Sequence, residues 1–582
     1  MEVHVVGGDS VREAIVAALE DVDVTVRDAD PTDLDGARFA IVSDVAGAAT
    51  FDRANEAARS GSTPWIGVEI GGVGGHPIEE LDAAVSGFAP ATGCFDCLRT
   101  RVASTLDSPA EQPRADRSAA RFAGALAGRE CVRVFSGDER SIVGHTIEVP
   151  HARRRFLPVP GCDCAAGERD RSLDRDDDAF DLETAVERVE LAIDDRVGLV
   201  TSVGEAESFP APYYLATTVE TAGFSDASAA KQAAGVDEDW NAAFMKAVGE
   251  GLERYCAGVY RDAEFVHASE DDLERVVSPT DLARPDDTST YDPSAERRWV
   301  EGENLETGET VHLPAAAVQF PQPGDRLVPA ITTGLGLGSS TVDALLSGLT
   351  EVLERDATML SWYSTFEPLG LDVDDDRFAK LERRARSEGL AVTALLVTQD
   401  IDVPVVAVAV HRDPADGAGE DPDAWPSFAA GSAAALDATA AATSALAEAL
   451  QNWTELRGLG PEDADDASGA IGEYGSSPEP ARTFVDVDRT IPAASVGPDP
   501  APTGRDALET LVSRTTECGL TPYAARLTTR DVEQLGFEAV RVVVPGAQPL
   551  FTGEPFFADR AGSVPADLGF EPRLDRPFHP YP

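Results

Sequence analysis

The sequence reads Glu250-Gly-Leu-Glu-Arg-Tyr255 in one segment and Glu351-Val-Leu-Glu-Arg-Asp356 in another, about a hundred residues later. Each segment lies in a stretch with apolar residues at helical spacing, and the predicted helices are residues 242–259 and 342–360. Residues i, i+3 and i+4 of a helix share one face, so the two glutamates and the arginine of each segment project together. A third predicted helix, residues 434–456, carries Glu448-Ala-Leu-Gln451 at the same spacing. We therefore expect a large α+β domain from about residue 182 onward.

These carboxylates have two interpretations. A solvent-facing network of ion pairs is the simpler one in so acidic a protein. The loops before the helices favour another, because Lys231 is one of only three lysines and an ammonium group suits a phosphate oxygen. The glycine-rich segment Thr332–Ser340 leads into the second helix, so its backbone amides can approach an anion closely. Carboxylates beside such groups are ligands for magnesium, and the sequence indicates a nucleotide–magnesium site without a Walker A motif.

The net charge of −56 comes from 104 acidic and 48 basic residues, and the acidic residues are spread along the chain. Such a surface repels nucleic acid. Dispersed acidic residues with almost no lysine suit a cytoplasm near molar salt, where the screening length is about 3 Å. We expect a halophilic protein, archaeal in type. The sequence has no run of eighteen apolar residues and no secretory signal, which predicts a cytoplasmic protein that does not enter a membrane.

The first ninety residues alternate between strand and helix patterns. Residues 3–6, 39–42 and 64–70 are predicted strands, and residues 11–19 and 52–59 are predicted helices. This order predicts a Rossmann-like parallel sheet in an N-terminal α/β domain. The first turn, Gly7-Gly-Asp-Ser10, does not match the GxGxxG fingerprint, which argues against nucleotide binding there. The charged segment Glu168–Asp178 marks a boundary between domains of residues 1–175 and 176–582.

Four of the seven cysteines form two close pairs, Cys94/Cys97 and Cys162/Cys164. Four thiolates can complete a tetrahedral zinc shell without an open position, which is typical of a structural site. A redox CxxC is the alternative, but it does not explain the second pair. We therefore predict a structural zinc site in the N-terminal domain.

The order of motifs in the C-terminal domain resembles the YcaO family over about residues 182–582. The matching segments are Ala230-Lys-Gln232 before Glu250-xx-Glu-Arg254, Thr333-Gly-Leu-Gly-Leu-Gly338 before Asp343 and Glu351-xx-Glu-Arg355, Gly431 before Glu448-xx-Gln451, and Arg541-Val-Val-Val-Pro-Gly546. The resemblance implies a magnesium–ATP site. It implies that the metal ligands come from Glu250, Glu253, Asp343, Glu351, Glu354 and Glu448. It also implies that the residues in contact with ATP are Lys231, Arg254, Arg355, Gln451 and Arg541.

The N-terminal domain resembles the ThiF-like (ubiquitin-activating-like) partner of azoline-forming YcaO proteins, on the segment Gly93-Cys-Phe-Asp-Cys-Leu-Arg-Thr-Arg101. In that family this domain has lost adenylation and delivers the peptide, and the missing glycine fingerprint agrees with such a loss. Fused family members begin with a winged-helix module that binds the leader peptide, whereas this sequence starts at a strand. We expect a separate leader-binding protein.

The sequence stops at Pro577-Phe-His-Pro-Tyr-Pro582, which is typical of an extended, polyproline-like segment. Most such tails are disordered. This one resembles the ends of azoline-forming cyclodehydratases, whose alternating prolines enter the active site. In that position the terminal carboxylate of Pro582 or the imidazole of His579 can remove the proton of the attacking side chain, so these are the two expected catalytic residues.

We expect an ATP-dependent cyclodehydratase that converts Cys, Ser or Thr of a ribosomally made peptide to azolines. A thioamide-forming YcaO enzyme and an inactive peptide-binding scaffold are the alternatives. The fused front domain and proline-rich end disfavour the first, and the complete set of motif carboxylates disfavours the second. The expected partners are the precursor peptide, a leader-binding protein, a flavin dehydrogenase and, as a homodimer, a second copy of the chain.

Overall fold

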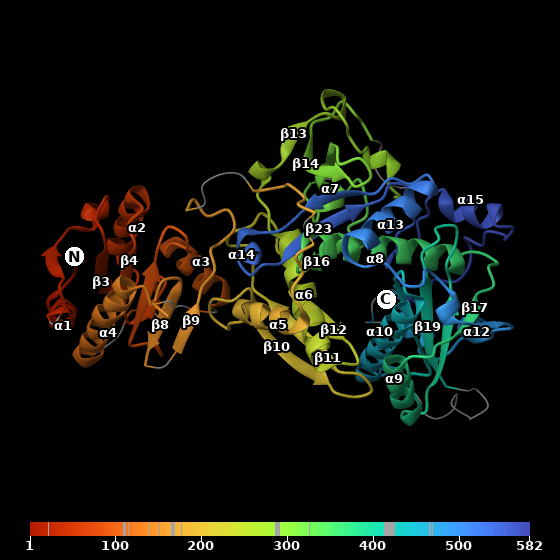
Figure 1. Ribbon diagram of the computed structural model, residues 1–582, viewed down its shortest axis with the longest axis horizontal. Helices are drawn as coiled ribbons and strands as arrows, with labels where there is room; N and C mark the ends of the chain where they lie inside the picture. The colour runs from red at the N-terminus through yellow and green to blue at the C-terminus, as the bar shows by residue number, and fades with distance from the viewer. Residues whose placement is uncertain are drawn as a thin grey trace.

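The computed structural model is elongated, with the N-terminal domain at one end and the proline-rich C-terminal segment in the body at the other (Figure 1). It describes residues 1–582 except 21, 107, 109–111, 114–115, 139, 151, 165–168, 176, 286–290, 325, 413–424, 465–466 and 468. Residues 168 and 176 of the predicted domain boundary lie outside the described part. Among the described helices, none is long and apolar enough to span a bilayer.

The N-terminal domain contains a seven-stranded mixed sheet. Its strand order is β2-β1-β3-β4-β7-β8-β9. The strands are β1 (Glu2–Val6), β2 (Thr25–Asp28), β3 (Ala40–Val45), β4 (Trp65–Ile70), β7 (Ala83–Phe88), β8 (His145–Val149) and β9 (Ala152–Arg155). Strands β1 to β4 are parallel, which confirms the predicted alternation of strand and helix in this region. The prediction of a parallel sheet was wrong beyond β4, because β7, β8 and β9 are antiparallel. The chain returns from β4 through a small hairpin, β5 (Gly72–Val73) and β6 (His76–Pro77), and parallel pairing requires a longer crossover.

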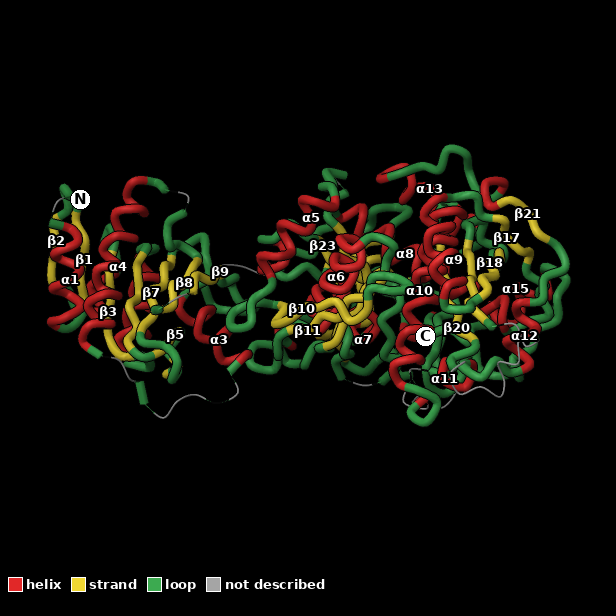
Figure 2. Tube along the Cα trace, turned by 90° about the horizontal axis from the view of Figure 1, so that it is seen from below, coloured by secondary structure: helices red, strands yellow, loops and turns green. Residues whose placement is uncertain are grey.

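Helices cover both faces of this sheet (Figure 2). Helices α1 (Asp9–Leu19) and α4 (Arg117–Ser136) contribute apolar side chains to one core cluster. Helices α2 (Ala49–Gly61) and α3 (Phe95–Thr105) contribute to a second cluster on the opposite face. Alternate residues of β1, β3 and β4 enter the two clusters, as expected for a sheet that is buried on both sides.

The described residues of the C-terminal domain form three further sheets. The first has the order β10-β11-β12, formed by Val200–Glu207, Tyr213–Thr218 and Gln232–Val236. The second has the order β13-β14-β22-β23-β16, with β15 beside β14. Its strands are β13 (Val266–Ala268), β14 (Arg297–Asn304), β15 (Thr310–Pro314), β16 (Leu335–Gly338), β22 (Tyr523–Arg526) and β23 (Glu538–Val543). The third has the order β20-β19-β18-β17-β21, formed by β17 (Leu369–Asp372), β18 (Ala391–Leu396), β19 (Val405–His411), β20 (Phe428–Ala434) and β21 (Thr490–Pro492).

One long helix packs on each of these sheets. Helix α6 (Trp240–Gly258) packs on β11 and β12, α8 (Thr341–Trp362) on β16 and β23, and α10 (Ala438–Leu459) on β19 and β20. All three predicted helices are therefore present. The third begins at residue 438 rather than 434, because residues 428–434 form β20 and the side chain of Asp437 caps the helix at the Thr439 amide. The remaining α-helices are α5 (Leu182–Val189), α7 (Ala315–Val318), α9 (Asp376–Ser387), α11 (Ile471–Tyr474), α12 (Glu479–Val485), α13 (Gly504–Glu517), α14 (Arg530–Glu533) and α15 (Arg560–Asp567).

Glycines let the strands approach these helices closely. A Cβ atom on Gly235 of β12 would lie 2.2 Å from the Ala247 nitrogen of α6, and one on Gly431 of β20 would lie 2.5 Å from the Ala449 nitrogen of α10. A larger residue at either position would push the helix away from its strand. This close packing holds the acidic motifs of the helices next to the strands.

Candidate functional site

The three long helices present their first glutamate in the same way. The carboxylates of Glu250, Glu351 and Glu448 each accept a hydrogen bond from a backbone amide sixteen or seventeen residues earlier. The donors are the amides of Ala234, Gly334 and Ser432, at 2.6, 3.0 and 2.6 Å. The repeated sequence motif therefore corresponds to a repeated strand–helix unit, and these glutamates have defined positions rather than free, solvated ones.

Arg355 lies among carboxylates from two helices. Its guanidinium is 3.5 Å from Glu354, 4.0 Å from Glu351 and 3.8 Å from Glu448. The Glu354 carboxylate also accepts a hydrogen bond of 2.7 Å from the Ser432 hydroxyl of β20. The second and third motifs thus meet at one buried site, which argues against the interpretation as a solvent-facing ion-pair network.

Burial of this acidic cluster raises the pKa values of its carboxyl groups. Burial, together with Glu351 and Glu250, raises the pKa of Glu253 to about 8. Burial also raises the pKa of Glu354 to about 8, although Arg355 opposes the shift. A bound cation stabilises the ionised form of carboxyl groups whose ionisation is disfavoured by burial. A set of oxygen ligands suits magnesium. The described residues therefore fit the predicted metal.

Of the residues predicted to contact ATP, Arg541 and Arg254 lie next to glutamates of the acidic motifs, whereas Lys231 pairs with a glutamate outside these motifs. Arg541 donates to the backbone carbonyls of residues 331 and 332, and burial lowers its pKa to about 10 beside Glu351 and Glu253. Arg254 lies 2.6 Å from Glu250. Lys231 is half exposed and pairs with Glu220 at 2.7 Å, which lowers the pKa of that glutamate to about 2.

Asp343 and Gln451 have other immediate partners. The Asp343 carboxylate accepts a 2.6 Å hydrogen bond from Ser339, and Asp343 lies about 12 Å along α8 from Glu351. The Gln451 amide donates to Glu455 at 3.0 Å, and the Tyr213 hydroxyl donates to the same carboxylate at 2.7 Å. Glu455 and Tyr213 were not predicted from the sequence. Their 242-residue separation leaves no local signal, although the spacing of Glu455 from Gln451 could have been noticed.

The proline-rich C-terminal segment packs into the domain. His579 is fully buried, and its Nε2 lies 2.7 Å from the Phe551 carbonyl oxygen. Tyr581 is also fully buried; burial and the charge of Glu354 raise the pKa of its hydroxyl, and Arg355 opposes the shift. The segment therefore lies within electrostatic range of the acidic cluster. It is not a solvated tail.

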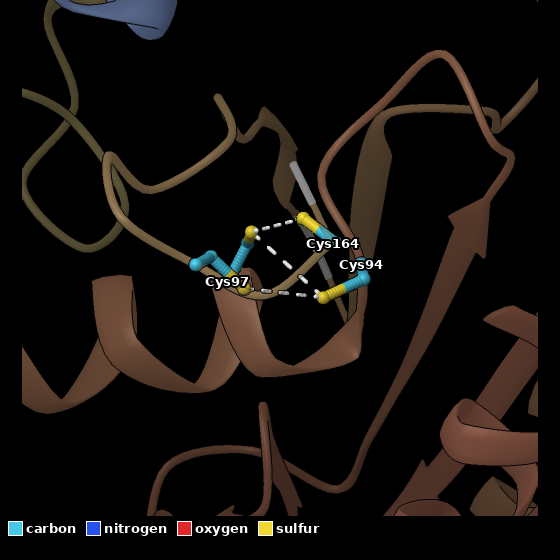
Figure 3. A group of neighbouring side chains, drawn as sticks. Cys94, Cys97 and Cys164 are labelled. Carbon is cyan, nitrogen blue, oxygen red and sulfur yellow. Dashed lines mark hydrogen bonds between the residues drawn. The ribbon is translucent and has the colours of Figure 1, made fainter. Parts of the chain in front are cut away.

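The four paired cysteines form one group, and their sulfur atoms all lie within 4.8 Å of one another. The Sγ–Sγ distances are 3.9 Å for Cys94–Cys97, 3.7 Å for Cys94–Cys162 and 3.5 Å for Cys97–Cys164. Figure 3 shows the sulfur atoms of Cys94, Cys97 and Cys164 turned toward one another at the start of α3. None of the four is in a disulfide. This group could hold a metal ion.

A buried polar network joins the N-terminal domain to α6. Arg101 of α3 pairs with Asp531 of α14 and donates to the Tyr255 hydroxyl at 3.3 Å, and Tyr255 donates to Asp531 at 2.7 Å. All three side chains are fully buried. Arg530 also donates to the Cys164 sulfur at 3.4 Å. The cysteine group and the motif helix α6 therefore contact the same short helix, α14.

The profile of the YcaO family, described as cyclodehydratases that bind ATP and Mg²⁺, matches residues 234–548, which contain all three acidic helices. The chain belongs to the YcaO family. An uncharacterised protein of Methanothermobacter thermautotrophicus is 33% identical over 177 residues, which are 28% of this chain and 45% of the relative. The chain thus spans about half the length of this curated relative.

Two solved structures share the fold of the whole YcaO chain. A heterocyclase in complex with substrate and cofactor has a TM-score of 0.74 at 18% identity, covering 100% of this chain and 85% of the other. The heterocyclase TruD has a TM-score of 0.62 at 17% identity, covering 98% of this chain and 81% of the other. Because both matches include the N-terminal region, they confirm the predicted combination of a front domain with a YcaO domain as a fold.

Proposed function

We propose that the chain is an ATP-dependent cyclodehydratase that converts Cys, Ser or Thr residues of a ribosomally made precursor peptide to azolines. The observation that carries the proposal is the buried acidic cluster around Arg355, built from the repeated motifs of a YcaO domain. The fold shared with two heterocyclases over the whole chain supports it. The expected reaction adds the side-chain nucleophile, with loss of its proton, to the preceding carbonyl carbon and transfers the γ-phosphoryl group of ATP to the carbonyl oxygen, which leaves ADP. The oxygen then departs with the phosphate as the amide nitrogen loses its proton and forms the C=N bond of the ring.

The residues of the cluster have distinct expected roles. Glu250, Glu253, Glu351, Glu354 and Glu448 would hold magnesium, which neutralises charge on the phosphoryl group when it is bound. Arg254, Arg355 and Arg541 would contact ATP, since a guanidinium matches phosphate oxygens. Lys231 would join them after exchanging its Glu220 partner for a phosphate. Asp343 stays a prediction as a metal ligand, because its carboxylate is bound to Ser339.

The C-terminal segment is proposed to lie beside the reacting amide. The electrostatic influence of Glu354 and Arg355 on Tyr581 supports this position. Of the two residues predicted to be catalytic, Pro582 suits such a role better than His579. Burial lowers the pKa of His579 to about 4, which makes its imidazole a weak base, and its Nε2 is engaged with a carbonyl.

We propose zinc as the metal of the cysteine group. A tetrahedral site with Zn–S bonds of about 2.3 Å has sulfur–sulfur edges of about 3.8 Å, and the three quoted separations are similar. Four sulfur ligands leave no open position, so the role is structural. Metal analysis of the purified protein should find one zinc per chain, and Cys94→Ser should lose it and destabilise the N-terminal domain. A chain that retains no stoichiometric zinc in its folded state would contradict the assignment.

The function is tested by incubating the protein with ATP, magnesium and candidate precursor peptides, and measuring peptide mass. Loss of one water per modified residue is expected. Replacement of a peptide oxygen by sulfur, dependent on added sulfide, would instead support the thioamide alternative. ATP-independent peptide binding without a mass change would support the scaffold. A leader-binding protein, a flavin dehydrogenase, a homodimer, the halophilic habitat and the cytoplasmic location remain predictions.

A further inference from the structure

Tyr581 lies in the proline-rich C-terminal segment, and its side chain is fully buried. Its ring is in edge contact with Phe484 of α12, at a centroid distance of 6.4 Å, and it stacks on His579 at 6.0 Å. The Tyr474 hydroxyl of α11 donates to the Phe578 carbonyl of the same segment. The ring and the backbone beside it therefore have a fixed position, and so does the hydroxyl at the end of the ring.

The Tyr581 hydroxyl is buried without a hydrogen-bond partner among the described residues. The hydroxyls of Tyr255 and Tyr260, which are also buried, donate to the Asp531 carboxylate and the Pro321 carbonyl. An unpaired buried hydroxyl lowers the stability of a fold, because it loses hydrogen bonds to water without replacing them. Such a group is retained where a ligand or an ordered water provides the partner.

The hydroxyl of Tyr581 lies within electrostatic range of the acidic cluster. Burial and the charges of Glu354 and Glu448 raise its pKa, and Arg355 opposes the shift, so the hydroxyl remains a donor at neutral pH. Arg355 Nη1 likewise has no hydrogen-bond acceptor among the described residues, although it lies 3.5 Å from Glu354. Two buried donors are therefore available near the proposed metal ligands, and a ligand oxygen can accept from them.

We propose that Tyr581 is a further catalytic residue, whose hydroxyl donates a hydrogen bond to the oxygen of the peptide carbonyl that is attacked. The inference deepens the proposed function, on which it rests, and it concerns a residue to which that proposal gives no chemical role. The position of Tyr581 supports it, because the next residue, Pro582, is the proposed base at the same amide. The γ-phosphate of ATP is the other source of an anionic oxygen at this place, and a measurement of ATP affinity separates the two.

The hydroxyl would act when charge develops on the carbonyl oxygen. Addition of the side-chain nucleophile, which loses its proton to the base, forms a bond to the carbonyl carbon and moves the π electron pair onto the oxygen. The Tyr581 hydroxyl donates to this oxygen without giving up its proton. The oxygen then takes the γ-phosphoryl group of ATP, and ADP leaves. A donor that is fixed before the reaction stabilises the developing charge without reorganising, and removing one such donor typically lowers kcat about 100-fold or more.

Tyr581→Phe tests this role, because it removes the hydroxyl and keeps the buried ring. The measurement is the single-turnover rate of water loss from a synthetic peptide that the parent chain cyclises, with excess protein and saturating ATP and magnesium. We expect this rate to fall about 100-fold, while the Kd values for the peptide and for ATP stay close to those of the parent. Thermal unfolding should show equal or higher stability, because the variant no longer buries an unpaired hydroxyl.

A control and a rescue separate the lost donor from general damage. Tyr260→Phe removes a buried hydroxyl that donates to the Pro321 carbonyl at 2.9 Å, so it should lower the unfolding temperature and leave the rate unchanged. Tyr581→4-aminophenylalanine places an N–H donor on a ring of the same shape. It should be at least about 10-fold faster than Tyr581→Phe, because a donor is again fixed at this position.

A parent-like rate and parent-like ATP affinity in Tyr581→Phe would overturn the inference and leave the proposed function standing, since the hydroxyl would then serve only a buried water. A parent-like rate at saturating ATP combined with weakened ATP affinity would assign the donor to a phosphate oxygen and would also overturn it. Failure of the amine to restore the rate would count against a donor role. If the parent chain removes water from none of the Cys-, Ser- and Thr-containing peptides, the proposed function fails, and this inference fails with it.

Discussion

Arg355 shows how individual residues make the site. Its guanidinium is within 4.0 Å of carboxylates from two motifs. Its positive charge therefore partly offsets the negative charge of a cluster whose ionisation is disfavoured by burial. Buried charges of this kind are kept for function more often than for stability, because replacing them by neutral groups is often tolerated. Because Glu448 and Glu351 repel the charge of Glu354, removing that one carboxylate relieves repulsion instead of leaving an unpaired charge.

Glu354→Gln should abolish ATP consumption without unfolding the protein. The substitution removes a charge that is already disfavoured, since burial raises the pKa of Glu354 to about 8, and it preserves side-chain volume. ATP turnover at saturating magnesium and thermal unfolding check the two parts of the prediction. Glu382→Gln on α9 is the matched control, because it removes a half-buried glutamate whose ion-pair partner, Arg386, is exposed. Parent-like turnover by Glu354→Gln would show that the proposed metal site is wrong.

At the scale of elements, the strongest sequence predictions were those with a local physical cause. Helical spacing of apolar residues located α6 and α8 to within two residues at each end. The strands that carry the donors to Glu250 and Glu448 were not predicted, and neither was the antiparallel half of the N-terminal sheet. Their pairing depends on contacts between distant segments, which no local pattern encodes. The C-terminal segment, typical of a disordered tail by composition, is ordered because Phe551 and Tyr474 bind its backbone and rings.

Docking of this segment should weaken on acidification. Burial lowers the pKa of His579 from 6.5 to about 4, so the packed state favours the neutral imidazole. The stabilisation of the docked segment by the neutral imidazole is fully present above about pH 6.5 and is lost as the pH falls toward about 4. The total change in docking free energy is on the order of 3 kcal/mol.

Hydrogen exchange at the amides of Phe578, His579 and Tyr581, corrected for intrinsic rates, should show progressive loss of protection over this pH range. The variant His579→Phe lacks the titrating group, so its protection should depend less on pH. Equal pH dependence in the parent and the variant would show that another group controls docking.

The whole molecule combines an N-terminal front domain and a YcaO domain, which are joined by a buried polar contact. Arg101, Asp531 and Tyr255 connect α3, α14 and α6, and Tyr255 follows the arginine of the first acidic motif directly. The core cluster beneath α6 also includes Cys94 and Cys97, so apolar packing crosses the same boundary. The sequence indicated both domains, but it gave no sign of this junction, because its residues are 154 to 430 positions apart.

Arg101→Met should uncouple the two domains. It leaves Asp531 buried without its cation, which typically costs about 3–5 kcal/mol. Calorimetry should then resolve a separate, earlier transition for the N-terminal domain. The double variant Arg101→Met/Asp531→Leu removes both charges and should recover much of the loss. A single parent-like transition in Arg101→Met would show that the junction does not couple the domains.

In the proposed reaction, ATP activates a peptide carbonyl because its γ-phosphoryl group is transferred to the carbonyl oxygen, which then leaves as part of phosphate. The most direct measurement uses a precursor peptide with ¹⁸O in the backbone carbonyl before the modified residue, incubated with the protein, ATP and magnesium. We expect one ¹⁸O atom in the released phosphate for each water lost from the peptide. Ring formation with unlabelled phosphate, or phosphate release without any loss of water from the peptide, would show that the carbonyl oxygen is not transferred in this way.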